Sequence, residues 1–193
     1  FSQTRLDSLW HLRKNLEEAS QLKQAQDDWC AKGSDNTAEF PDDLSKELLV
    51  DILRGRVNVS VTSSMSHSKV NKVFYSNSHS YETVDYNNLA QLTNQFRFHI
   101  STIHHAHEAY LTIPRLKQFF GGPPAAAIFA TNARYKLESF RGSEYAPYIL
   151  TENGIMTTCV SDHPVLNSQY LLFEAQQTYM YGLNMSSALK TVT

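Results

Sequence analysis

Apolar residues near the start of the chain recur at steps of three and four, the spacing of one face of an α-helix. These positions are Leu9, Leu12, Leu16, Ala19, Leu22 and Trp29. They predict a long amphipathic helix that ends near Cys30 and turns its charged residues to solvent. After a polar loop over 31–40, Pro41 is expected to open a second helix that ends at Gly55. The apolar positions of this second helix are Leu44, Leu48, Leu49 and Ile52.

Expected strands and helices alternate through the rest of the chain. A first strand should begin near Arg56. Later strands are expected over 98–103, 125–130 and 155–160, and helices over 85–96, 114–121, 143–154 and 167–181. This alternation predicts parallel βα units, of which about four are visible, whereas a closed eight-stranded barrel needs roughly 250 residues. The sequence therefore predicts an α/β fold, a partial TIM-type (β/α) barrel with an extra N-terminal helical region.

Residues 59–76 do not fit this alternation. They lie where one short strand should run from Val57 to His79, and their serine and lysine content has no consistent period, which predicts an inserted loop. The Val-Ser and Tyr-Ser pairs at the two ends can be encoded GTGAGT and TATAGC, which match a splice donor and acceptor. A retained intron is therefore a hypothesis for this stretch, and sequencing the transcript tests it.

The composition indicates a globular domain that acts on small molecules. The chain of 193 residues is 41% hydrophobic and 19% charged, enough for one domain over 1–193, and no apolar run of about 18 residues predicts a membrane span. The net charge is −2 and no basic stripe indicates nucleic-acid binding. Oligomeric state is left open, a homo-oligomer included.

The cysteines and the chain ends bear on cellular context. Cys30 and Cys159 lie far apart and form no CxxC pair, so we expect free thiols and a cytoplasmic location. No signal-peptide pattern follows Phe1. Because the chain lacks an initial Met and its last residues fall in an apparent helix, we expect it to be part of a longer protein.

Residue types that commonly bind metals follow the expected strands. His79 lies near the first strand, His105 follows the next one, and Asp162 follows the last. Parallel strands direct their carboxyl ends to one edge, so imidazoles and a carboxylate on successive βα turns suit a metal site there. A metal-dependent hydrolase is the leading hypothesis.

Each of these residues also has an ordinary structural explanation. His79 alone would often be a surface or capping residue, and Asp162 could cap a turn. One turn cannot aim three rings at a single metal, so His105 is taken as the candidate ligand, while His104 and His107 are expected to pack or to support it.

Other polar residues near the strand ends are weaker candidates. Arg134 and Tyr135 lie on a loop where the guanidinium could bind a substrate carboxylate, although a solvated loop charge explains Arg134 equally well. Glu82 and Glu108 are expected to be solvent-facing carboxylates at helix starts.

Three strings in the second half resemble a known family. They are His104–Tyr110, Ala130–Tyr135 and Ser161–Leu171. The chain resembles the imidazolonepropionase-like branch of the metal-dependent amidohydrolases from about Thr4 to its end, interrupted by 59–76. Members of that family are eight-stranded barrels, so the resemblance implies that the chain supplies roughly the last four βα units.

The resemblance implies roles for individual residues. His79 matches the fifth-strand metal ligand, His105 the sixth-strand histidine and Asp162 the eighth-strand aspartate. Arg134 and Tyr135 follow the seventh strand as candidate substrate-binding residues. The chain departs from the family because it has no HxH pair on an early strand. The implied cofactor is a divalent metal, zinc or iron.

The implied reaction is hydrolysis of a non-peptide C–N bond, for example in a cyclic amide. A divalent ion polarises a carbonyl and lowers the pKa of a bound water toward about 7. Asp162 would accept the water's proton and pass it to the leaving nitrogen, while His105 would bind a second metal or stabilise the oxyanion. Two alternatives stay open: an inactive remnant without the early HxH pair, and a binding module with a structural metal.

Overall fold

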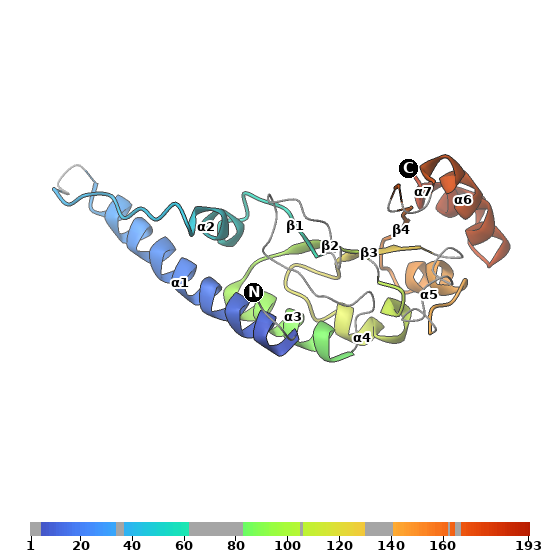
Figure 1. The fold of residues 1–193 in the computed structure, drawn as a ribbon, viewed down its shortest axis with the longest axis horizontal. Coiled ribbons are helices and arrows are strands. Elements are labelled where there is room, and N and C mark those ends of the chain that lie inside the picture. Colours follow the sequence, from blue (N-terminus) through green and yellow to red (C-terminus); the bar gives the residue numbers. More distant parts are fainter. Residues whose placement is uncertain are drawn as a thin grey trace.

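Four short parallel strands form the centre of the molecule (Figure 1). The computed structural model describes residues 5–33, 37–61, 83–104, 106–129, 141–161, 163–164 and 167–193. The strands are β1 (Val59–Val61), β2 (Ile100–His104), β3 (Ala125–Ile128) and β4 (Thr157–Cys159). They are hydrogen-bonded in chain order, β1-β2-β3-β4, and every neighbouring pair is parallel. The predicted α/β fold with parallel βα units is confirmed for these residues.

Helices precede, connect and follow the strands along the chain. They are α1 (Arg5–Ala31), α2 (Glu47–Leu53), α3 (Thr83–Phe96), α4 (Ile113–Leu116), α5 (Ala146–Glu152), α6 (Leu171–Met180) and α7 (Met185–Lys190), with 3-10 turns η2 (Ala109–Leu111) and η5 (Ser168–Tyr170). In Figure 1, α3, α4 and α5 lie along one side of the sheet, and α6 and α7 gather at its β4 end. No helix of the described residues is both long and apolar enough to cross a membrane.

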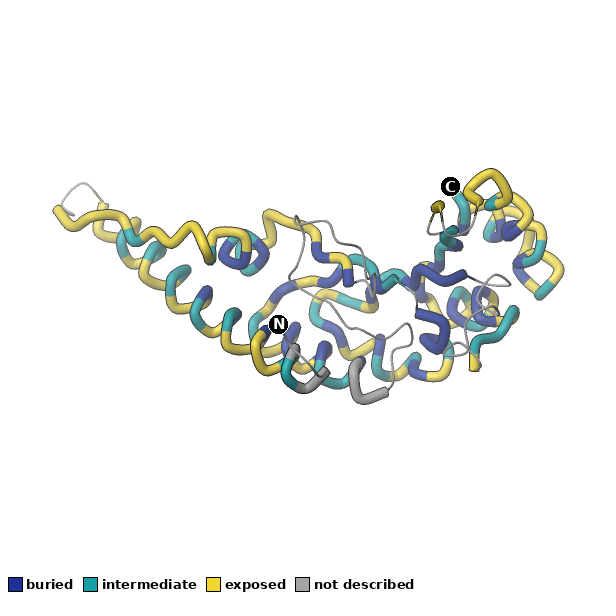
Figure 2. Tube along the Cα trace, viewed as in Figure 1, coloured by how far each residue is buried: buried dark blue, intermediate teal, exposed yellow. Residues whose placement is uncertain are grey.

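The core lies between the sheet and the helices that cover it. Ile100 and Ile103 of β2 and Leu150 of α5 are at most 1% exposed. Figure 2 shows buried residues concentrated along the strands and the adjoining helices, while the far end of α1 carries half-buried and exposed residues. Buried residues such as these hold the strands in place, because close packing leaves the side chains little freedom of movement.

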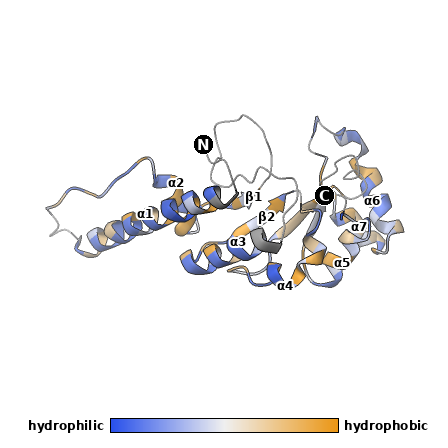
Figure 3. Cartoon of the chain, turned by 60° about the horizontal axis from the view of Figure 1, so that its bottom comes forward, coloured by the Kyte–Doolittle hydropathy of each residue, from blue (hydrophilic) through white to orange (hydrophobic). Residues whose placement is uncertain are grey.

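The long first helix is confirmed. Leu12, Leu16 and Ala19 are buried, as the spacing of three and four predicts, and α2 packs beside α1. The remaining surface of α1 is mainly hydrophilic (Figure 3). The expectation that a second helix opens at Pro41 is wrong, since α2 begins at Glu47.

A turn occupies the place of the expected first turn of α2. The carboxylate of Asp43 accepts hydrogen bonds from the backbone N–H and the hydroxyl of Ser45, at 2.9 and 2.6 Å. Such local side-chain bonds compete with helix formation. Leu44 is consequently 80% exposed, whereas Leu49 and Ile52 are buried as expected.

Two expected segments differ from the structure. The first three residues of 59–76, a stretch expected to be an inserted loop, form the strand β1, with Val59 and Val61 buried. Residues 62–76 lie outside the described residues. The helix expected over 114–121 is a single turn, α4, because turns follow Leu116 up to Gly121, whose φ is +81°.

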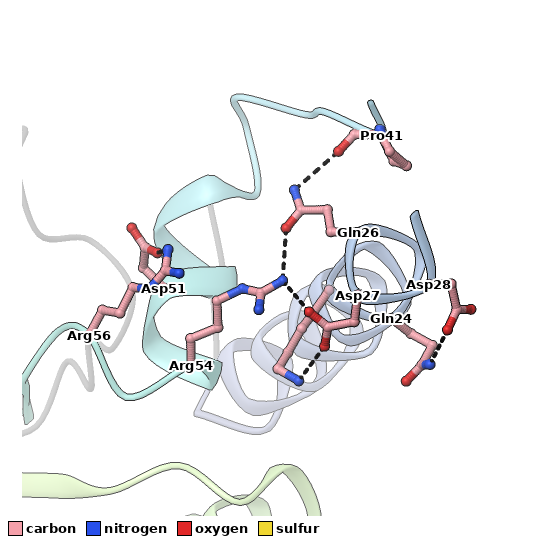
Figure 4. Close-up of polar contacts among 9 residues, drawn as sticks. Gln24, Gln26, Asp27, Asp28, Pro41, Asp51, Arg54 and Arg56 are labelled. Carbon is pink, nitrogen blue, oxygen red and sulfur yellow. Dashed lines mark hydrogen bonds and ion pairs between the residues drawn. The ribbon is translucent and has the colours of Figure 1, made fainter. Parts of the chain in front are cut away.

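Polar contacts join α1 to α2 (Figure 4). Asp27 accepts hydrogen bonds from Lys23 at 3.0 Å and from Arg54 at 2.7 Å. Arg54 also donates to the side-chain oxygen of Gln26, whose amide nitrogen donates to the carbonyl of Pro41 at 3.1 Å. The carboxylate of Asp27 therefore ties the second helix to the first.

Asp27→Asn is expected to reduce the acid sensitivity of the fold. The hydrogen bond from Lys23, followed by that from Arg54, holds the pKa of Asp27 below its ordinary value of 3.8. A carboxyl group with a lowered folded pKa stabilises the fold above its unfolded pKa, and this stabilisation is lost as the pH falls through the folded value. Urea denaturation between about pH 5 and pH 2 should show a smaller loss of stability for the variant than for the wild type.

Asp28→Asn is the matched control for this prediction. In the wild type, the carboxylate of Asp28 accepts a hydrogen bond from the neutral side chain of Gln24 at 2.8 Å. The control should keep the pH dependence of the wild type. Identical pH profiles for the wild type and Asp27→Asn would contradict the role given to the carboxylate of Asp27.

Candidate functional site

The carboxyl ends of β2, β3 and β4 lie side by side at one edge of the sheet. His104 pairs with Ala127, and Ile128 pairs with Cys159. Hydrogen bonding continues past the strand ends, because the N–H of Ala106 donates to the carbonyl of Ala127 at 3.1 Å and the N–H of Val160 donates to that of Ile128 at 2.9 Å. We call this row of strand ends the strand-end edge.

The predicted site residues lie outside the residues that the structure describes. They are His79, His105, Arg134, Tyr135 and Asp162. Their convergence on one metal therefore stays a prediction. The chain neighbours of two of them are described. His104 and Ala106 flank His105, and Ser161 and His163 flank Asp162.

His107 is buried beside the strand-end edge. His107 is 3% exposed. The centroid of its ring lies 5.4 Å from that of Phe129, and the two ring planes meet at 34°. Phe129 directly follows β3 and is 1% exposed. This contact agrees with the expected packing role of His107 and joins the turn after β2 to the end of β3.

Glu108 is not solvent-facing, so that expectation is wrong. The residue is 4% exposed, and its carboxylate lies 3.6 Å from the guanidinium of Arg141. The hydroxyl of Tyr110 donates to the carbonyl oxygen of Arg141 at 2.6 Å. Burial, followed by the charge of Glu108, raises the pKa of Tyr110. Sequence periodicity could not predict the Glu108–Arg141 ion pair, because the two residues are far apart in the chain.

A second polar cluster lies between β4 and the C-terminal helices. The N–H of Cys159 donates to the carbonyl of Thr191 at 2.7 Å, and the hydroxyl of Thr158 donates to the same oxygen at 3.0 Å. Burial raises the pKa of the Cys159 thiol to about 11, so the thiol is protonated at neutral pH. Because thiolates are the reactive form, Cys159 is a structural residue.

No three His, Cys, Asp or Glu side chains of the described residues are grouped so that they could hold a metal ion. A surface hollow on α1 is lined by Trp10, Arg13, Lys14 and Glu17, none of which belongs to the strand-end edge. The predicted donors are two imidazoles and one carboxylate, and zinc accepts both kinds of ligand. The chemistry of this donor set therefore fits a divalent metal, although the donors lie outside the described residues.

Comparisons with known proteins found a relative in sequence and a solved structure with a similar fold. The sequence matches no protein-family model. It is 38% identical over 196 residues to the amidohydrolase tasK of Hapsidospora irregularis, and the match covers 98% of this chain but 18% of that protein. The crystal structure of an amidohydrolase from Thermotoga maritima has a TM-score of 0.69 and 19% identity, over 98% of this chain and 44% of that one.

These likenesses differ in what they establish. The chain spans less than half of either relative, and the structural match at 19% identity concerns the fold alone. The match to tasK adds sequence identity along nearly the whole chain. The match to tasK therefore supports homology to that amidohydrolase over the shared segment, and the Thermotoga maritima structure supports the likeness in fold.

Proposed function

We propose that this chain forms part of a metal-dependent hydrolase that cleaves a non-peptide C–N bond in a small molecule, for example a cyclic amide. The observation that carries the proposal is the strand-end edge, where three parallel strands end side by side. His105 directly follows His104 of β2, and Asp162 comes shortly after Cys159 of β4. Support at the level of a hydrolase family comes from the amidohydrolase relatives.

We place the chain in the imidazolonepropionase-like branch, as the last four βα units of a TIM-type barrel. The four strands follow one another in chain order and all run parallel, as successive strands of such a barrel do. This chain covers 44% of the Thermotoga maritima protein. That coverage agrees with a barrel in which other residues supply the remaining strands.

His79, His105 and Asp162 are the proposed ligands of zinc or iron. When bound, such an ion polarises the substrate carbonyl and lowers the pKa of water. Asp162 takes a proton from the attacking water and gives it to the leaving nitrogen, so one carboxylate serves as base and then as acid. Arg134 and Tyr135 hold the substrate, the guanidinium pairing with a carboxylate through two parallel hydrogen bonds.

An inactive remnant of such an enzyme is the second candidate. The sequence has no HxH pair on an early strand, and it supplies three of the about four ligands that a zinc site requires. Metal-dependent turnover by a barrel completed with the early HxH pair would distinguish the two candidates, since a remnant would bind metal weakly and hydrolyse nothing.

Zinc binding tests the proposed ligand set. Competition with a chromophoric chelator should show about one zinc per chain, and His79→Ala, His105→Ala and Asp162→Ala should each weaken binding by about tenfold or more, because each removes a ligand. His11→Ala is the matched control, since His11 is an exposed histidine on α1. Equal zinc affinity in all four variants would contradict the proposal.

A further inference from the structure

Residues 106–110, which come after β2, are held in place from two sides. On one side, the N–H of Ala106 donates to the carbonyl of Ala127 in β3 at 3.1 Å. On the other, Glu108 and Tyr110 both contact Arg141, through a 3.6 Å ion pair and a 2.6 Å hydrogen bond. The first contact fixes residues 106–110 to the sheet, and the others fix them to the segment before α5.

The Glu108 carboxylate depends on this arrangement. Its side chain is 5% exposed, whereas that of Arg141 is 48% exposed, so the arginine reaches from the surface toward a buried anion. A buried carboxylate is costly without a charged partner. An ordinary helix-start carboxylate would instead remain in solvent, and its ion pair would contribute little.

The position of Glu108 relates it to the proposed site. His105 immediately precedes Ala106, and Glu108 lies within the same short connection between β2 and η2. Groups that orient a metal ligand typically change metal affinity about 10- to 100-fold when they are removed. A buried ion pair two residues beyond a backbone anchor restricts how the connection can move.

We propose that Glu108 is a positioning residue, which acts through Arg141 to hold residues 106–110, the segment that directly follows His105 in the chain. The inference rests on the proposed function, because it assigns His105 as a metal ligand. Glu108 itself does not bind the metal or the substrate. Its carboxylate holds this segment, and Tyr110 adds a second contact to the backbone of Arg141.

Cobalt and zinc binding by the full chain test this role. Glu108→Gln preserves the shape of the side chain and removes its charge, so it should weaken zinc binding by about tenfold and shift the visible absorption of the bound cobalt ion. Arg141→Gln should have a similar effect, and the losses should be less than additive in the double variant, because the Glu108–Arg141 ion pair is common to both changes. Tyr110→Phe should have a smaller effect.

Ile155→Val is the matched control for stability. Ile155 is 1% exposed, and shortening it should lower the urea midpoint of unfolding without changing zinc affinity or the cobalt spectrum. If Glu108→Gln does not fold, Arg141→Gln removes the same ion pair from its more exposed side.

The outcomes separate the positioning role from the proposed function. If His105→Ala weakens metal binding while Glu108→Gln and Arg141→Gln leave affinity and spectrum unchanged, the positioning role is overturned and the ligand assignment stands. If neither the wild type nor any variant binds metal through His105, the proposed function is overturned, and the positioning role with it.

Discussion

The isolated chain of 193 residues is expected to hydrolyse neither cyclic amides nor N-acyl compounds when zinc is added. A mononuclear zinc site uses about four ligands, and His79, His105 and Asp162 supply three. The described sheet also has four strands, whereas a closed barrel of this type has eight. An incomplete site on such a sheet cannot hold water and substrate in the geometry that turnover requires.

The assay uses hydantoin and an N-acetyl amino acid as probes, with zinc or iron added. No product above the rate of the buffer is expected. The contrary result is specific: turnover that requires the metal and disappears in Asp162→Ala would show that the chain carries a complete site.

Phe129→Ala should produce the largest loss of stability among single substitutions near the strand-end edge. Phe129 is 1% exposed, follows β3 and packs beside His107. Replacing a buried phenylalanine by alanine costs about 3–5 kcal/mol, because it removes apolar contacts and leaves a cavity. A typical domain has only about 5–15 kcal/mol of net stability, so this variant should be partly unfolded in mild denaturant.

Phe173→Ala is the matched control for that variant. Phe173 lies on α6 and is 58% exposed, so its removal should change the free energy of unfolding by about 0.5 kcal/mol or less. Chemical denaturation of both variants provides the comparison. Equal losses would mean that Phe129 does not anchor the end of β3.

Regular spacing made part of the fold predictable. The buried residues Leu12, Leu16 and Ala19 of α1 recur at helical steps, so one helix face could be identified without tertiary information. The alternation of strands and helices likewise predicted parallel pairing. Both signals are local, and each is repeated several times along the chain.

Features that depend on one local bond or on distant partners were not predictable. Because Asp43 and Ser45 form a turn, α2 begins only at Glu47, although the apolar pattern of a helix begins earlier. The three-residue strand β1 exists through its pairing with β2, and its length carries no clear period. Glu108 has the sequence context of a solvent-facing helix start, yet it is buried and pairs with Arg141, which no local spacing connects to it.

The candidate site was predicted from residue type and from position after the strands. The structure places the strand ends that precede His105 and Asp162 at one edge, which agrees with the physical premise of that prediction. Side-chain convergence depends on the turns beyond the strands, for which hydrophobic periodicity gives no rule. The ligand assignments therefore remain predictions.

The most direct test of the shared metal site is a crystal structure of the chain grown with zinc, with anomalous diffraction recorded at the zinc edge. We predict one strong peak, with ring nitrogens of His79 and His105 and a carboxylate oxygen of Asp162 each about 2.0–2.2 Å away. A peak bound by His104 in place of His105, or His79 and Asp162 at opposite ends of the sheet, would contradict the account.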